Sequence, residues 1–203
     1  MGLRERKKQQ TEERIYRTAL RLFQQRGYAT TTVEEIAQAA EVAKGTFFNY
    51  FPTKDAVLGY LGQRQMRLVQ QALAHTPEFE EQSTYEQLMF VLNTLAAGVQ
   101  DDWEVMRAVS LETFRSASAF SDTTSAARQL YDLFLRIIRR GQERGELRTT
   151  APAESLTLIV LSTYLYTFLA WLELDPPPPL TLLLQTHLNV LLEGMKPAPG
   201  TSL

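Results

Sequence analysis

The stretch TTVEEIAQAAEVAKGTFFNYFPTK, residues 31–54, decides the fold. Thr32 and Glu35 have the spacing of a capping box, in which the threonine caps a helix start and the glutamate reaches back to the threonine amide. Residues 41–43 are a short connector before a second helical stretch, residues 44–51, which Pro52 ends. The pattern predicts two short helices joined by three residues.

The flanking sequence predicts two longer helices around this pair. Residues 15–23 place apolar side chains at helical spacing, and Gly27 offers a C-terminal stop. Thr53 is positioned to cap an amphipathic helix that ends near Pro77. Two short helices supported by a preceding helix are the plan of a helix-turn-helix domain, although the same hairpin also occurs as plain packing.

The start of the second short helix suits the major groove of DNA. Lys44 can donate to guanine, Gly45 lets the backbone approach closely, and Thr46 offers a hydroxyl and a methyl group. The residues expected to complete the contact, chiefly on phosphates, are Thr31, Thr32, Phe48, Asn49, Tyr50 and Lys54. Each has a plain alternative, such as a helix cap, a packing ring or a solvated charge.

Charge is distributed unevenly along the chain. Residues 1–54 hold ten Lys and Arg against six Asp and Glu, whereas residues 55–203 hold eleven against seventeen. A basic segment joined to an acidic body is typical of a protein that meets a polyanion at one end. The alternative is that the basic residues 4–8 form a solvated N-terminal tail.

The run from Gly27 to Leu58 resembles the signature of the tetracycline-repressor (TetR) family, and the likeness covers roughly residues 10–62. The resemblance implies a DNA-binding domain over residues 1–54 and a helical ligand-binding and dimerisation domain over residues 55–203. It further implies a homodimer that binds a palindromic operator on double-stranded DNA and is released by a small-molecule effector.

Four positions depart from the family pattern. Glu41 stands where the family often has glycine in a left-handed turn, which predicts a cost of ~1 kcal/mol. Ala43 replaces a frequent Ser or Thr cap, and Phe48 and Asn49 replace the more usual tyrosine pair. These departures bear on the operator sequence and the affinity for it.

The remainder of the chain predicts further helices and no strands. Thirty Leu against five Ile and ten Val favour helix over strand. The expected fold class is all-α, with a three-helix helix-turn-helix domain and about nine helices in total. The expected later segments are helices near 85–99 and 103–114, a Ser- and Thr-rich loop at 116–125, a helix to about Arg144, helices at 153–174 and 180–195, a proline spacer at 176–179 and a frayed tail at 197–203.

The last two helices carry more apolar residues than one core-facing stripe requires, which predicts a surface for a second copy of the chain. The residues assigned to that surface are Leu161, Leu165, Leu184, Leu188 and Leu191. A monomer with these helices central in its core is the alternative.

A largely apolar effector is expected to lie among the middle helices, because ligand pockets are mostly apolar. The candidate lining residues are Trp103, Met106, Phe114, Phe134, Tyr164 and Phe168, with Glu112 and Arg115 as polar anchors. Aromatic residues at helical spacing are also typical of plain core.

Composition argues against other classes of protein. The chain has no Cys and two distant His, His75 and His187, so we expect no metal and no cofactor. It lacks GxSxG, GxxxxGK[ST] and HExxH motifs, so we expect no enzyme; a helical protein-binding adaptor without DNA activity is the rival function. The uncharged stretch 155–172 is interrupted by Ser and Thr, and no signal peptide is visible, so a cytoplasmic protein outside the membrane is expected.

Overall fold

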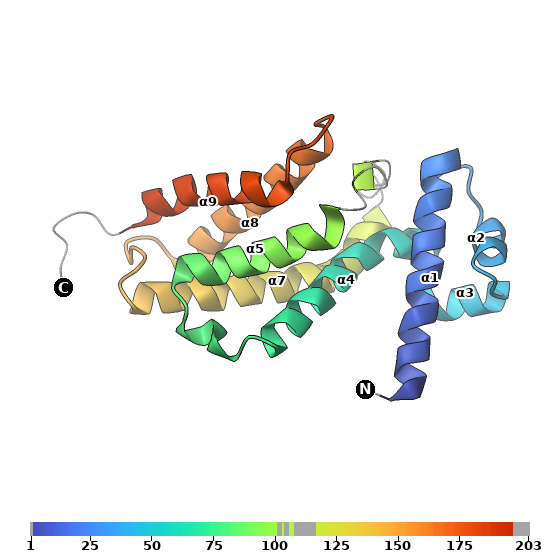
Figure 1. Ribbon diagram of the computed structural model, residues 1–203, viewed down its shortest axis with the longest axis horizontal. Coiled ribbons are helices and arrows are strands. Elements are labelled where there is room, and N and C mark those ends of the chain that lie inside the picture. Colours follow the sequence, from blue (N-terminus) through green and yellow to red (C-terminus); the bar gives the residue numbers. More distant parts are fainter. Residues whose placement is uncertain (1, 101–102, 104–105, 108–116, 197–203) are drawn as a thin grey trace. The chain divides into compact units, whose positions relative to one another are not determined.

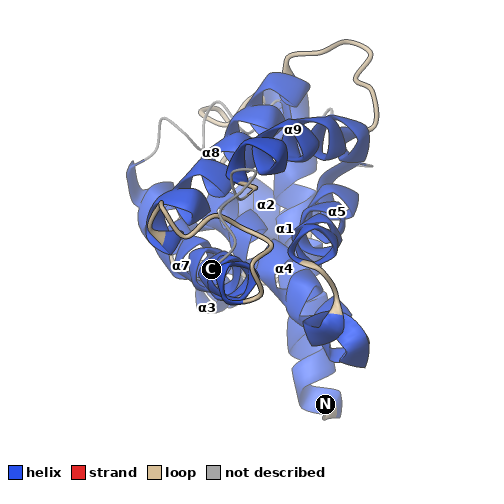
Figure 2. Ribbon diagram, turned by 90° about the vertical axis from the view of Figure 1, so that its left-hand side faces the viewer, coloured by secondary structure: helices blue, strands red, loops and turns tan. Residues whose placement is uncertain are grey.

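The computed structural model describes the chain except residues 1, 101–102, 104–105, 108–116 and 197–203; for Glu5 and residues 117–125 it describes the backbone alone. The described residues form α-helices, one 3-10 helix and no strand, which confirms the all-α class (Figures 1 and 2). Two compact units are present. The first comprises Met1–Gln63 with Asp102–Ser125, and the second comprises Arg64–Asp101 with Ala126–Leu203.

The first unit contains α1 (Leu3–Arg26), α2 (Val33–Ala39), α3 (Lys44–Tyr50) and the beginning of α4 (Lys54–Ala74). Gly27 ends α1 as predicted: its φ is 85°, and its amide donates to the Phe23 carbonyl at 2.8 Å. Ile15, Ile36 and Phe47 are each 0% exposed and fill the core of this unit.

The N-terminal segment is helical, because α1 begins at Leu3. Residues 4–8 therefore belong to the first turns of a 24-residue helix, and the side chains of Arg4, Arg6, Lys7 and Lys8 are exposed on it, so these residues are solvated but helical.

The second unit contains the remainder of α4, η1 (Pro77–Glu81), α5 (Thr84–Gln100), α7 (Ala117–Glu143, from Ala126 on), α8 (Ala153–Leu172) and α9 (Leu180–Met195). Helix α9 packs against both α5 and α8. The Trp171 ring is fully buried, and its Nε1–H donates to the Pro178 carbonyl at 2.8 Å, which ties α8 to the proline spacer.

One expected loop is helical. Residues 117–125 lie within α7, where a Ser- and Thr-rich loop was predicted from 116 onward. Each Ser or Thr costs a helix only about 0.5 kcal/mol relative to Ala. Extending an established helix adds one hydrogen bond for each residue fixed, so the strongly amphipathic part of α7 after Ala126 can carry this weaker segment.

Helix α8 is long and apolar enough to cross a membrane by length and composition. Its Leu156, Val160 and Phe168 are buried within the second unit, and the hydroxyl of the buried Thr157 donates to the Ala153 carbonyl. The structure thus places α8 as a core helix that keeps an exposed side.

Candidate nucleic-acid interface

The capping box at the start of α2 is formed as predicted. The Thr32 hydroxyl accepts from the Glu35 amide at 3.2 Å, and the Glu35 carboxylate accepts from the Thr32 amide at 2.8 Å. Arg26 also pairs with Glu35 at 3.0 Å. These hydrogen bonds lower the pKa of Glu35, those from Thr32 most strongly. The cap fixes where α2 begins, and therefore how it meets α3.

The turn between α2 and α3 contains a strained residue. Glu41 has a φ of 53°, in the left-handed region that favours glycine. The next amide, of Val42, donates to the Ala37 carbonyl at 2.9 Å. The left-handed geometry expected for position 41 is therefore present, and Glu41 adopts it without the freedom of glycine.

Helix α3 presents one side outward and anchors the other. Phe47 is fully buried and lies 5.8 Å from Phe51 between ring centroids. Lys44 and Gly45 are exposed, and a Cβ built on Gly45 meets no atom within 4 Å. Of the remaining predicted contact residues on α3, Phe48 and Asn49 are exposed and Thr46 and Tyr50 are half-buried. The start of α3 therefore offers open backbone beside a cation.

Lys44 has an ion-pair partner within the unit. Its ammonium hydrogen-bonds the carboxylate of Glu34 on α2, and this contact is the main cause that lowers the pKa of Glu34. Both side chains are exposed, so the pair joins α2 to α3 on the surface. The sequence did not predict this pair, because ten residues separate its members.

Lys54, at the start of α4, is bonded to the loop between α1 and α2. Its ammonium donates to the carbonyls of Tyr28 at 2.7 Å and Thr31 at 2.9 Å, and lies 4.1 Å from the centre of the Tyr28 ring. The Tyr28 hydroxyl in turn donates to Asp55. Lys54 thus fastens the loop before α2 to the start of α4, a role that the predicted phosphate contact did not include.

The burial of Thr31 contradicts the prediction that this residue contacts DNA. The residue is 1% exposed, and its hydroxyl donates to the Gly27 carbonyl at 2.8 Å. A buried hydroxyl that is already bonded within the chain is unavailable to a phosphate, so Thr31 stabilises the loop after α1 instead. Thr32 is exposed but serves as the cap of α2.

The candidate effector residues are divided between the two units. Phe134 and Phe168 are buried in the second unit, and Met106 is buried and Trp103 half-buried in the first. Phe114, Glu112 and Arg115 lie outside the described residues.

Tyr164 is the candidate effector residue with a polar partner in the second unit. The ring is half-buried, and desolvation raises the pKa of Tyr164 to about 12, while a hydrogen bond with Gln65 of α4 opposes the rise. Tyr164 therefore links α8 to α4 through a neutral hydroxyl.

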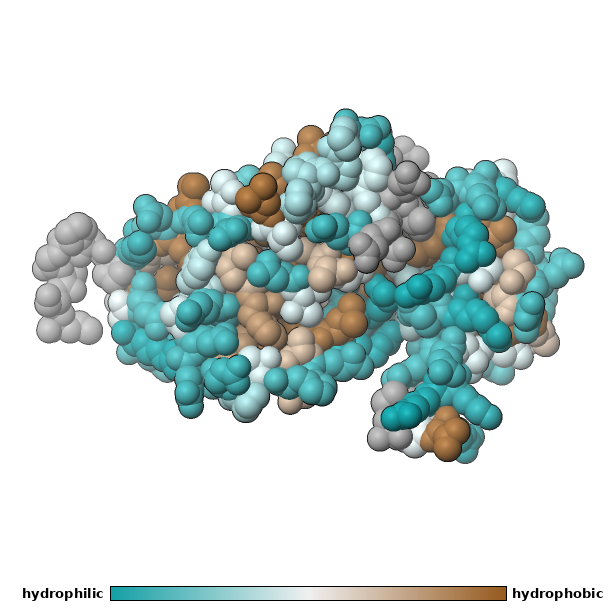
Figure 3. Space-filling model, in the orientation of Figure 1, coloured by the Kyte–Doolittle hydropathy of each residue, from teal (hydrophilic) through white to brown (hydrophobic). Residues whose placement is uncertain are grey.

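A groove of about 820 Å³ lies between α4 and α5 of the second unit. The apolar part of the groove wall is formed by Leu68, Phe90 and Ala97. Figure 3 shows apolar residues gathered on the face of the second unit that contains the groove. Arg64 spans the groove and donates to the Gly98 carbonyl at 2.8 Å. The sequence did not single out this groove, because its residues come from two helices whose pairing the sequence does not show.

The prediction that Leu184 and Leu188 face a second copy of the chain is wrong. Leu184 and Leu188 are each 2% exposed, because α9 turns them toward the core of its own unit. Leu165 is 43% exposed, and Leu161 and Leu191 are half-buried. The large apolar side chains that α8 and α9 do expose are Leu158, Ile159, Leu165, Tyr166, Leu182 and Val190.

The fold and the outward face of α3 define a helix-turn-helix protein, and comparison with known proteins identifies its kind. The family model for bacterial regulatory proteins of the tetR family matches residues 15–61. The regulator TcmR of Streptomyces glaucescens is 50% identical over 56 residues, which are 28% of this chain and 25% of that protein. Three curated relatives, YuxN and YerO of Bacillus subtilis and TcmR, are matched over only 16% to 26% of their own length.

Solved structures extend the likeness to the whole chain. FadR of Thermus thermophilus, a TetR-family transcriptional repressor solved in complex with lauroyl-CoA, is 32% identical, with a TM-score of 0.65, over 95% of this chain and 100% of that one. FadR of Bacillus halodurans shares the fold at 23% identity, with a TM-score of 0.76, over 91% of this chain and 95% of that one. The chain belongs to the TetR family of bacterial regulatory proteins.

Proposed function

We propose that this protein is a cytoplasmic repressor that binds a palindromic operator as a homodimer and is released by an effector that carries a long apolar chain. The observation that carries the DNA-binding part is the exposed start of α3. Lys44 and the open backbone of Gly45 face outward there, while Phe47 anchors the helix from behind. A helix so anchored can present its first turn to base edges in the major groove.

The exposed apolar residues of α8 and α9 support the homodimer. Leu165, Tyr166 and Val190 are 43%, 75% and 72% exposed, and large exposed apolar side chains on two helices that pack together are typical of an interface between subunits. Pairing two copies through one shared face gives a two-fold symmetric dimer. Such a dimer matches the symmetry of a palindromic operator.

A long-chain acyl thioester is the effector class that we propose. The relative solved with lauroyl-CoA is similar over 95% of this chain, including the helices of the second unit. Buried aromatic side chains such as Phe134 and Phe168 are compatible with an apolar acyl chain, since ligand pockets are predominantly apolar.

Helix α4 is the element through which we propose that the effector acts. The helix is continuous from Lys54 to Ala74 and contributes residues to both units. In the second unit Arg64 is bonded to the Gly98 carbonyl of α5, and Gln65 to Tyr164 of α8. A shift of α5 or α8 on effector binding would therefore move the helix that begins beside the DNA-binding helices.

Fluorescence anisotropy with DNA tests this function. Duplexes from the region around the protein's own gene are titrated with the protein, with and without lauroyl-CoA, free CoA and laurate. We expect specific binding that lauroyl-CoA weakens and free CoA leaves unchanged. The rival function, a protein-binding adaptor, predicts no duplex bound more tightly than random DNA.

A further inference from the structure

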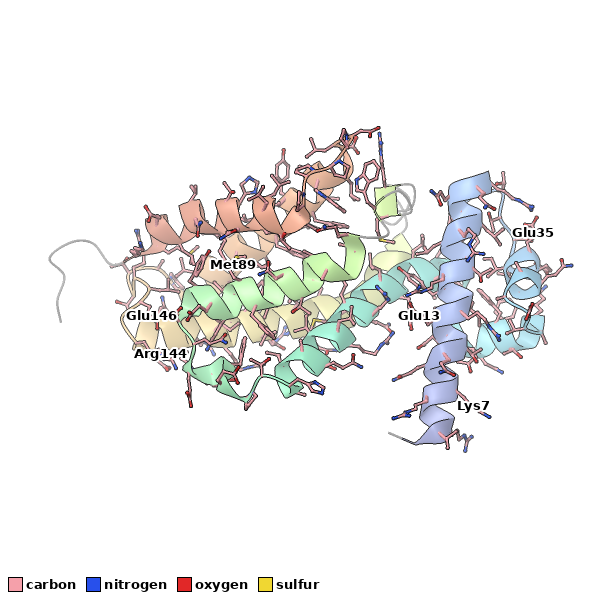
Figure 4. All side chains as sticks on the ribbon, in the orientation of Figure 1. Lys7, Glu13, Glu35, Met89, Arg144 and Glu146 are labelled. Carbon is pink, nitrogen blue, oxygen red and sulfur yellow. The ribbon has the colours of Figure 1, made fainter. Side chains whose placement is uncertain are left out.

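The first turns of α1 carry a basic face that takes no part in the proposed contact between α3 and DNA. Arg4, Lys7 and Lys8 are exposed and lie within the helix. In Figure 4 the labelled Lys7 lies on the end of α1 away from Glu35, which marks α2.

The helical register places this face in line with the packed side of α1. Arg4, Lys8, Ile15 and Ala19 are separated by four, seven and four residues, so they fall on one face at 3.6 residues per turn. Ile15 and Ala19 are each 0% exposed, whereas the two basic residues are exposed. The side of α1 that packs in the core therefore continues, toward the N-terminus, as a basic surface.

The basic surface reaches beyond the packed part of its unit. At 1.5 Å per residue, Arg4 lies roughly 16 Å along the axis from Ile15. Figure 1 shows the N-terminal end of α1 extending past α3 within the same unit. A reach of that size corresponds to about five base pairs at ~3.4 Å each.

We propose that Arg4, Lys7 and Lys8 bind backbone phosphates of DNA that flanks the half-site contacted by α3. This inference rests on the proposed DNA-binding function and adds a second, sequence-independent contact to it. Duplex DNA carries a phosphate charge about every 1.7 Å along its axis, so a row of exposed cations on a projecting helix finds partners without reading bases.

The composition of the segment favours DNA over an anionic membrane. Among residues 3–11, Leu3 is the one large apolar side chain, and the others are charged or polar. A helix that lies on a membrane needs an apolar face to insert, which this segment lacks. The full chain is also titrated onto vesicles with anionic lipid at physiological salt. An affinity for these vesicles equal to the affinity for flanked operator would favour the membrane and overturn the proposal.

An operator is first selected from a pool of random DNA by its binding to the protein. The test then compares two duplexes that both contain this operator. One duplex ends at the palindrome, and the other extends it by eight base pairs of arbitrary sequence on each side. The full-length protein and the variant Arg4→Ala/Lys7→Ala/Lys8→Ala are titrated onto both duplexes at several salt concentrations. The variant Arg128→Ala/Arg136→Ala/Arg139→Ala, which removes three exposed cations from the second unit, is the matched control.

On the long duplex we expect the slope of log K against log salt to fall by about 0.9 for each phosphate that the variant no longer neutralises, up to about 3 per protomer. On the short duplex the α1 variant should match the unchanged protein, and the control should match it on both. Equal slopes for the α1 variant and the unchanged protein on the long duplex would overturn the inference while leaving operator binding intact. Failure of the unchanged protein to prefer either duplex over random DNA would instead refute the proposed function.

Discussion

The Lys54 ammonium donates to the Thr31 carbonyl at 2.9 Å, which joins the start of α4 to the loop before α2. The same ammonium bonds the Tyr28 carbonyl and lies against the Tyr28 ring. Since two of its three hydrogens are used within the chain, this cation acts first on the stability of the DNA-binding unit.

Lys54→Ala is therefore expected to destabilise the protein more than it alters DNA electrostatics. Hydrogen bonds from a charged donor contribute about 1.5–3 kcal/mol, so we expect a loss of ~1–3 kcal/mol in the free energy of unfolding, measured in urea. The salt dependence of operator binding should stay unchanged at temperatures where the variant is folded. A slope reduced by about one, with unchanged stability, would show that Lys54 contacts a phosphate instead.

Lys44 is expected to read bases, and its ion pair with Glu34 should oppose that reading. Lys44→Ala should cost ~1–3 kcal/mol on the operator and relax the sequence preference. Glu34→Gln should strengthen operator binding modestly, by up to about fivefold, because the exposed ion pair no longer has to be broken before Lys44 meets a base. Anisotropy titrations on operator and random duplexes measure both effects, and equal losses on the two duplexes for Lys44→Ala would contradict the base-reading role.

The strained turn gives a prediction about stability. Glu41 has a φ of 53°, and a left-handed conformation costs an ordinary residue roughly 1–2 kcal/mol. Glu41→Gly is thus expected to raise the free energy of unfolding by about 1 kcal/mol, after the entropy that glycine loses on folding. Glu41→Ala is the control, since alanine keeps the strain; a gain in stability for alanine equal to that for glycine would assign the effect to charge.

Two pairs of substitutions distinguish the residues that support the proposed dimer from those that support the core. Leu165→Arg/Val190→Arg changes exposed residues and should give a folded monomer by light scattering and circular dichroism. Leu184→Arg/Leu188→Arg places charge in the core and should unfold the second unit, because an unpaired buried charge costs several kcal/mol. A folded dimer from the first pair would show that α8 and α9 do not form the interface.

Local signals in the sequence predicted most of the fold. The Thr32–Glu35 capping box and the stop at Gly27 depend on neighbouring residues, and the structure contains both. The left-handed geometry of position 41, which the family resemblance implied, is also present. The helical segment 117–125 was missed because its support comes from the rest of α7, which local propensity does not register.

Features that depend on tertiary packing were harder to predict from the sequence. Periodicity showed that α9 has an apolar surplus, but did not show which residues face its own core, so Leu184 and Leu188 were misassigned. The buried hydroxyl of Thr31 and the contacts of Lys54 join residues from separate elements. Lys44 and Gly45, the positions proposed to read bases, by contrast lie within one short helix, and the structure exposes both.

A long-chain acyl-CoA effector and operator DNA are proposed to control each other's binding. Calorimetry with lauroyl-CoA, on the full-length protein alone and on the protein saturated with operator, tests this coupling most directly. Coupling of ~1–3 kcal/mol is usual for such regulation, and linkage is reciprocal, so we predict that operator weakens lauroyl-CoA binding by about 5–150-fold. Binding of lauroyl-CoA with the same affinity in the presence and absence of operator would contradict effector-controlled repression.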